Sequence, residues 1–258
     1  MTAAQNQTAA IERGQTYLVV PTRNSRFKAV HPFVGPGTYQ NTGNQILGQG
    51  LKIPTGEETA FLIDEVYNSE NDEFRKSSEA ESIRKIMKDN WLWLFNREIW
   101  MPRKGKNPGL YVIQDSKVEG ISAPFSLEEL QDKLSGGETE RGVQFSKDRT
   151  TAFAPYSTFS LGVQPSKDLS NSGFAISNYS GVDGAEKISK VAENFTLNPS
   201  IYGVSENKEP VQRVAGLSRG WYIVGGLDLD GCSRGSGTGS FAFGVSENVA
   251  EGDTPKNR

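Results

Sequence analysis

One stretch of the sequence, residues 91–115, constrains the fold more than any other. It reads WLWLFNREIWMPRKGKNPGLYVIQD and holds three of the four tryptophans. Both of its ends are nearly continuous apolar runs, and a basic segment with proline and glycine, residues 102–109, separates them. Strands that are apolar along their whole length are usually buried on both faces of a sheet. We therefore expect two central strands, 95–101 and 110–114, joined by a turn.

The first residues of this stretch fit two descriptions. Apolar residues at helical spacing begin at Ile83 and continue through Trp91 to Leu94. This spacing favours assigning residues 91–94 to the last turn of a helix that begins at Ser78. Periodicity alone does not separate that assignment from the start of a strand, so both stay open.

Capping patterns predict where the helices begin. In such a pattern a Ser, Thr or Asp precedes a Glu by three residues. It occurs at Thr55, Ser78, Ser126 and Asp183, which predicts about four helices. The segment 31–50 is rich in Gly, Pro, Asn and Gln, and we expect a long functional loop or several short turns there.

The remaining elements are predicted to be strands. Short apolar runs bounded by turn residues lie at 17–20, 27–30, 143–146, 151–154, 159–163, 174–177, 211–214, 221–224 and 241–245. Helical and strand patterns are mixed without strict alternation, which favours the α+β class over a doubly wound α/β fold. We expect a mixed, mostly antiparallel sheet with about four helices and a β-rich C-terminal half.

The polar ends of the sequence suggest the domain limits. Residues 1–14 are small and polar without periodicity, and we interpret them as a flexible or partner-bound N-terminal arm. Residues 250–258 are interpreted as a polar C-terminal tail. A single α+β domain is expected over 15–249, with a subdomain boundary near 135–141 as the alternative, because helical patterns become scarce after it.

Composition removes several classes of function. The chain has one cysteine, Cys232, and one histidine, His31, so it has no pair for an internal disulfide and no ligand set for a cysteine-based zinc cluster. Its net charge of −3 is too small to attract nucleic acid or a membrane to the protein as a whole. The N-terminus lacks the pattern of a signal peptide, and no window approaches the ~18 apolar residues of a membrane span. We expect a cytoplasmic protein without membrane association.

Two segments near the C-terminus resemble ligand-binding motifs only in part. The glycine-rich segment 231–239 has no lysine of a phosphate loop, and a strand pattern follows it where a dinucleotide site needs a helix. We therefore expect no cofactor. Asp228 and Asp230 match part of a calcium loop, but the third acidic ligand and the closing Glu are missing. A turn-stabilising role is favoured over a metal site.

The tryptophan-rich stretch also carries the one local basic patch. Its cations and neighbouring aromatics are Arg97, Arg103, Lys104, Lys106, Trp93 and Trp100. Aromatic rings among cations can stack on bases and hold phosphates. A buried core followed by a solvated turn explains the same residues, and we prefer that interpretation.

Three function hypotheses follow from the sequence. The first is a non-enzymatic structural or protein-interaction protein, in which the arms and Gly-rich loops contact partner chains or copies of the protein itself. The second is a nucleic-acid-binding module that uses residues 91–106. The third is a carboxylate-dependent hydrolase, which needs two acidic groups in one cleft. The first is favoured because no catalytic motif is present.

Overall fold

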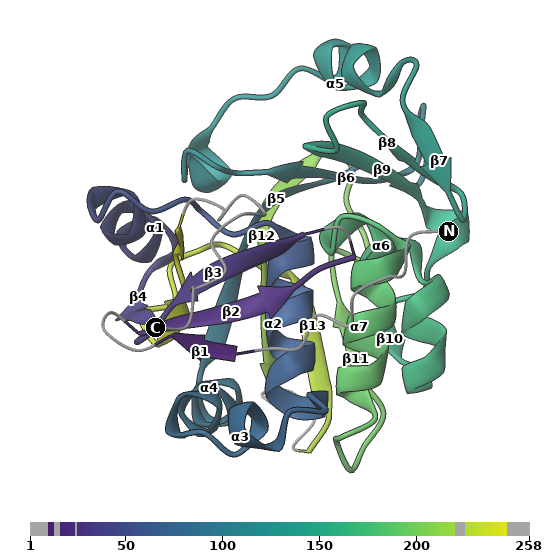
Figure 1. Ribbon diagram of the computed structural model, residues 1–258. Helices are drawn as coiled ribbons and strands as arrows, with labels where there is room; N and C mark the ends of the chain where they lie inside the picture. Colours follow the sequence, from purple (N-terminus) through teal and green to yellow (C-terminus); the bar gives the residue numbers. More distant parts are fainter. Residues whose placement is uncertain (1–9, 13–15, 24, 220–224, 247–258) are drawn as a thin grey trace, which may run out of the picture.

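The computed structural model describes residues 10–12, 16–23, 25–219 and 225–246. Within them, eleven strands form a mixed sheet, and helices cover both of its faces (Figure 1). The order across this sheet is β10 (Gly162–Val163), β11 (Ser200–Tyr202), β13 (Leu227–Ser233), β12 (Val211–Arg219), β5 (Trp91–Trp100), β6 (Gly109–Gln114), β9 (Thr151–Pro155), β8 (Val143–Phe145) and β7 (Glu138–Glu140). Off this path, β14 (Ser240–Ala242) pairs with β5 and with β4 (Val34–Gly37).

Most strand pairs are antiparallel. The parallel pairs among the described strands are β11 with β13 and β14 with β5. A second, four-stranded antiparallel sheet contains β1 (Ala10–Glu12), β2 (Tyr17–Pro21), β3 (Arg26–Val30) and β15 (Val245–Ser246). The α+β class with a mixed, mostly antiparallel sheet is therefore confirmed.

The helices are more numerous than predicted. The described residues hold seven α-helices, namely α1 (Tyr39–Gly48), α2 (Gly56–Asn68), α3 (Asp72–Arg75), α4 (Ser78–Asp89), α5 (Leu127–Leu134), α6 (Gly173–Asn178) and α7 (Val182–Ala192). Three short 3-10 helices are η1 (Gly120–Ser122), η2 (Tyr156–Thr158) and η3 (Ser166–Asn171). The prediction of about four helices was too low.

Strand β5 is the centre of the structure because side chains on both of its faces are buried. Leu92, Leu94 and Trp100 belong to the large core cluster that also contains residues of α2, α6 and α7. On the opposite face, Trp93 and Phe95 pack with residues of α1. The two long apolar runs of the sequence thus form adjacent antiparallel strands, β5 and β6, near the middle of the sheet.

The interpretation of residues 91–94 as a helical turn was wrong. Helix α4 ends at Asp89, and Trp91 and Leu92 already pair with Ser218 and Leu217 of β12. This pairing joins segments more than a hundred residues apart, and no local pattern contains it. Long-range strand pairing therefore outweighs the helical spacing.

Two of the unpredicted helices lie in segments for which the sequence predicted another structure. Helix α1 lies within 31–50, where we expected a loop or turns; Thr38 caps it by accepting a hydrogen bond from the Asn41 backbone N–H at 3.2 Å. Few of its residues are apolar, so the sequence shows little periodicity. Helix α6 replaces the strand predicted at 174–177, because it is buried on all sides and such short apolar runs do not distinguish helix from strand.

The other sequence predictions have mixed outcomes. The Thr55 capping box is present, with the Thr55 N–H donating to Glu58 Oε2 at 2.7 Å. Ser77 and Gly181, not Ser78 and Asp183, are the N-cap residues of α4 and α7. The strand predicted at 159–163 is reduced to Gly162–Val163.

Several predictions concern residues that the structure does not describe. The predicted strand 221–224, the tail 250–258 and residues 1–9 and 13–14 of the arm lie outside the described residues. Of the predicted arm, residues 10–12 form β1 and pair with β2. The single-domain prediction for 15–249, and the alternative boundary near 135–141, stay predictions; β7 lies within that boundary and belongs to the main sheet.

A polar cluster is buried beside the centre of the sheet. Glu98 of β5 is 0% exposed and accepts hydrogen bonds from Asn178 Nδ2 at 2.8 Å and from Trp100 Nε1 at 2.9 Å. The Asn96 amide donates to the Asn178 backbone oxygen, and Trp100 Nε1 also donates to the Gly231 oxygen. These bonds connect β5 to α6 and β13, so the cluster fixes their positions. Burial raises the pKa of Glu98 to about 8, against its ordinary 4.5.

We predict that Glu98 makes the folded state less stable as the pH rises from about 5 to 8. The unfolded chain loses the Glu98 proton near its ordinary pKa of 4.5, whereas the folded chain keeps it until about pH 8. The folded state therefore binds more protons throughout this window. Glu98→Gln has no proton to lose, so its stability relative to the native protein should rise by on the order of a few kcal/mol between pH 5 and pH 8.

Urea unfolding at several pH values measures this difference. Glu128→Gln on the exposed surface of α5 is the matched control and should leave the pH dependence unchanged. A difference between native and Glu98→Gln proteins that stays constant from pH 5 to 8 would contradict the prediction.

Candidate functional site

A row of residues crosses four neighbouring strands on one face of the sheet. Thr139 of β7 lies opposite Gln144 of β8, Gln144 opposite Phe153 of β9, and Phe153 opposite Tyr111 of β6. Directly opposed residues in antiparallel strands project from the same face. The row therefore forms a floor that runs across the strands from the β7 edge towards Ile99 of β5.

Helix α5 forms a wall over this floor. Its N-cap is Ser126, as predicted, and its buried Leu130 packs with Ile99 and Tyr111. The helix ends in a turn where Gly136 has a φ of +70°, and a Cβ on Gly137 would lie 1.8 Å from the Phe145 oxygen. Only glycine allows so close an approach to β8. The turn thus fixes the distance between the end of α5 and the sheet edge.

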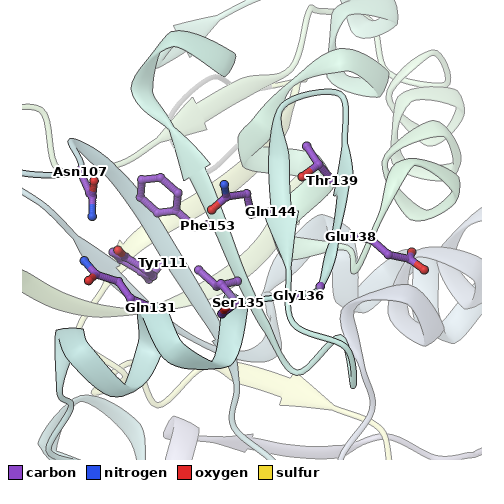
Figure 2. A pocket seen from close by; sticks show the side chains of 11 residues that line it. Asn107, Tyr111, Gln131, Ser135, Gly136, Glu138, Thr139, Gln144 and Phe153 are labelled. Carbon is purple, nitrogen blue, oxygen red and sulfur yellow. The ribbon is translucent and has the colours of Figure 1, made fainter.

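The helix and the row of strand residues enclose a groove of about 430 Å³, shown in Figure 2. Its lining residues are Asn107, Tyr111, Gln131, Leu134, Ser135, Gly136, Gly137, Glu138, Thr139, Gln144 and Phe153. The two rings of the floor lie at one end, and Gln144 and then Thr139 follow towards the edge (Figure 2). We call this site the α5 groove.

The α5 groove combines aromatic rings with unused amide groups. The ring centroids of Tyr111 and Phe153 are 4.6 Å apart. The exposed side chains of Asn107, Gln131 and Gln144 make no hydrogen bond within the described part of the chain. Each amide offers donors and an acceptor at the same site. Because Tyr111 and Phe153 are 1% and 9% exposed, the rings form the base of the groove, and polar groups make up most of its accessible surface.

A second, acidic cleft of about 640 Å³ lies between the β7–β8 hairpin and the start of α7. Its acids are Glu57, Glu138, Glu140 and Asp183, and its arginines are Arg23 and Arg149. The hydrolase hypothesis required a cleft with two acidic groups, and this cleft has them. Burial, followed by the charge of Asp183, raises the pKa of Glu57.

The charged side chains of this cleft also make contacts that stabilise the fold. Glu140 Oε2 accepts the Val182 backbone N–H at 2.9 Å, and Glu140 Oε1 lies 2.7 Å from Arg149 Nη2. Arg149 also donates to the Ser180 oxygen and lies over the Phe145 ring. These contacts provide a hydrogen-bond acceptor for a backbone N–H at the N-terminus of α7, and they attach this helix to the β7–β8 hairpin. The hydrolase hypothesis stays a prediction.

The nucleic-acid hypothesis also stays a prediction, and the structure separates its residues. Trp93 and Trp100 are 2% and 0% exposed, so no base can stack on either ring in this conformation. Arg97 is buried as well, at 8%. The cations that remain exposed are Arg103, Lys104 and Lys106. Arg103 lies 4.4 Å from the ring centre of Tyr156 and donates to the Ser205 oxygen.

Asp228 and Asp230 lie on strand β13 and not in a loop. Both are buried, at 0% and 4% exposed. Asp230 accepts the Cys232 backbone N–H at 2.7 Å, and burial raises its pKa. Among the described residues no group of three or more His, Cys, Asp or Glu side chains could hold a metal ion. A metal site at these two residues stays a prediction.

Sequence reasoning missed the α5 groove. Tyr111 lies in a run that predicts a buried strand, Phe153 lies in a short strand pattern, and Thr139 and Gln144 match no motif. What joins them is strand register, which the sequence does not display. The capping pattern at Ser126 located α5, and the strand patterns at 110–114, 143–146 and 151–154 located β6, β8 and β9.

None of the described helices has both the length and the apolar character needed to span a bilayer.

Comparison with known proteins bears on the fold. No protein family matches the sequence, and no curated protein does. A solved structure is similar, and it is described as "Accommodation of massive sequence variation in Nanoarchaeota by the C-type lectin fold". The two chains are 18% identical and align with a TM-score of 0.54, covering 88% of this chain and 100% of the other. The similarity is one of fold, and this chain resembles the C-type lectin fold.

We predict that the Glu140–Arg149 pair is needed for stability. Glu140→Ala removes the acceptor for the Val182 N–H, and Arg149→Ala removes the four contacts of the guanidinium, with Glu140, Glu138, the Ser180 oxygen and the Phe145 ring. Each change should therefore lower the free energy of unfolding by about 1–2 kcal/mol. Because both changes break the same ion pair, their effects should not add. Urea denaturation measures this.

Glu138→Ala is the control, since the Glu138 side chain is 78% exposed and its ion pair with Arg149 should contribute less than about 1 kcal/mol. Equal stability of the Glu140→Ala and native proteins would show that this contact is dispensable for folding.

Proposed function

We propose that this chain is a non-enzymatic protein-interaction protein that holds a segment of another chain, or of a second copy of itself, in the α5 groove. The observation that carries the proposal is the set of exposed amides, Asn107, Gln131 and Gln144, placed around a paired aromatic floor without hydrogen bonds among the described residues. Peptide segments present both apolar side chains and main-chain amide groups. The α5 groove offers a contact for each.

The composition of the groove supports binding more than catalysis. Among the lining residues that the structure describes, Glu138 is the only acid, whereas hydrolysis by carboxylates requires two. The similar solved structure is described as accommodating massive sequence variation. A fold that accommodates sequence variation suits binding, because a reaction site needs several side chains held in one arrangement.

Other contacts belong to the same proposal. The arm 1–14 and the Gly-rich loops would add to the interface with partner chains or with copies of the protein. A cytoplasmic location is consistent with the single cysteine.

Selection from a random peptide library tests the proposal. The native protein should enrich peptides that bind the groove. The Gln144→Trp variant should bind the same peptides at least ten-fold more weakly, because the larger side chain fills the groove. Gln144 is exposed on a strand, where tryptophan is well accepted, so folding should be preserved. Mass spectrometry of the enriched peptides after incubation should find them intact.

Gln45→Trp, at an exposed position of α1, is the matched control and should bind as the native protein does. If the enriched peptides bound the Gln144→Trp variant as tightly as the native protein, their binding site would lie outside the α5 groove. Cleaved peptides would contradict the non-enzymatic part of the proposal.

A further inference from the structure

Resting on the proposed function, we propose that the α5 groove selects an extended segment with one apolar anchor and, about three residues away, a lysine or arginine. The apolar side chain would lie against Phe153 and the half-buried Leu134, because Tyr111 beneath them is only 1% exposed. The cation would lie beyond the β7 edge, beside Glu138. The inference follows from the order of the side chains along the groove, with aromatic rings at the inner end and an acid at the outer end.

The length of the floor sets the number of residues. Its row crosses four strands, and neighbouring strands are about 4.8 Å apart, so the floor is about 14 Å long. An extended chain advances about 3.3 Å per residue, so about four residues span it. Phe153 on β9 is two strand spacings, about 9.6 Å, from Thr139 on β7, so an anchor at Phe153 and a side chain at the β7 edge are about three residues apart.

The inner end of the groove is the apolar one. Phe153 and Tyr111 form the floor there, and the half-buried Leu134 of α5 lies beside them. Figure 2 shows the two rings between Asn107 and Gln144, with Gln131 alongside. An apolar side chain of the segment would contact Leu134 and the exposed edge of Phe153, while the amides hydrogen-bond its main chain. Because Phe153 is only 9% exposed, the added burial is modest.

The outer end offers main-chain hydrogen bonds. A two-residue turn with positive φ at Arg141 and Gly142 closes the β7–β8 hairpin, so Glu140 and Val143 form its last hydrogen-bonded pair. The next pair, Thr139 with Gln144, is then a non-hydrogen-bonded one. The N–H and C=O of Thr139 consequently point away from β8, and β8 is the strand that pairs with β7 among the described strands.

The charge beyond the edge is negative. Glu138 lines both the α5 groove and the acidic cleft, and its side chain points away from the floor in Figure 2. A segment that leaves the groove over β7 therefore meets a cleft in which four acids face two arginines. Arg149 lies closer to Glu140, at 2.7 Å, than to Glu138, at 3.3 Å. The exposed Glu138 carboxylate thus keeps lone pairs for a cation of the segment.

NMR titration with capped synthetic peptides tests the inference. The reference peptide is acetyl-Ser-Phe-Ser-Ser-Lys-Ser-amide, and its variants replace Phe by Ser, Lys by Ser, or Lys by Asp. The side-chain amide signals of Gln131 and Gln144 should shift on binding, while that of Gln45 should not. Removing Phe should weaken binding roughly five- to ten-fold, and removing Lys roughly two- to five-fold.

A charge reversal provides the sharper test. Glu138→Lys should reverse the preference, so that the Asp peptide binds more tightly than the Lys peptide. Glu81→Lys, at an exposed position of α4, is the control and should keep the native preference. Thermal unfolding of both variants checks that they are folded.

The outcomes separate this inference from the proposed function. In one outcome, Gln144→Trp abolishes the binding of library peptides, but the synthetic series shows no dependence on Phe or no reversal with Glu138→Lys. The selection rule is then wrong, and the groove remains a binding site. If no library peptide depends on the groove, the proposed function fails and this inference fails with it.

Discussion

The burial of β5 on both faces is the constraint on which the rest of the structure depends. A strand with Leu92, Leu94 and Trp100 on one side and Trp93 and Phe95 on the other needs a covering layer on each side. Helices α2, α6 and α7 supply one layer, and α1 and α5 supply the other. The polar cluster at Glu98 lies within the first layer, where its hydrogen bonds with Trp100 and Asn178 give the apolar packing a defined register.

The two layers have different consequences for binding. Residues of α2, α6 and α7 pack into the large core cluster, together with residues of α4, β2 and β3. On the other face, α5 is only eight residues long and covers the ends of β5 and β6, so β8 and β7 extend beyond it. The α5 groove is the space that this short helix leaves open. A longer helix in the same place would have covered Gln144 and Thr139.

The sequence was sufficient for features that arise locally or from one strong pattern. The apolar runs located β5 and β6, and the caps at Thr55 and Ser126 located two helices, because a cap is formed by residues three apart. It was insufficient where distant residues decide. Trp91 is in a strand because of Ser218, α1 is a helix although few of its residues are apolar, and the groove floor exists because four separate strands place one residue each in a row.

The small sheet carries a consequence for how the protein is made. Strand β15, at residues 245–246, pairs with β3, at residues 26–30, and β2 lies on the other side of β3. This sheet therefore cannot be completed until residue 246 has left the ribosome. During synthesis the edge of β3 that pairs with β15 stays unpaired. Its pairing with β15 then joins residues more than two hundred positions apart. Folding that ends with so distant a contact is expected to be slow compared with that of a helical protein of similar stability.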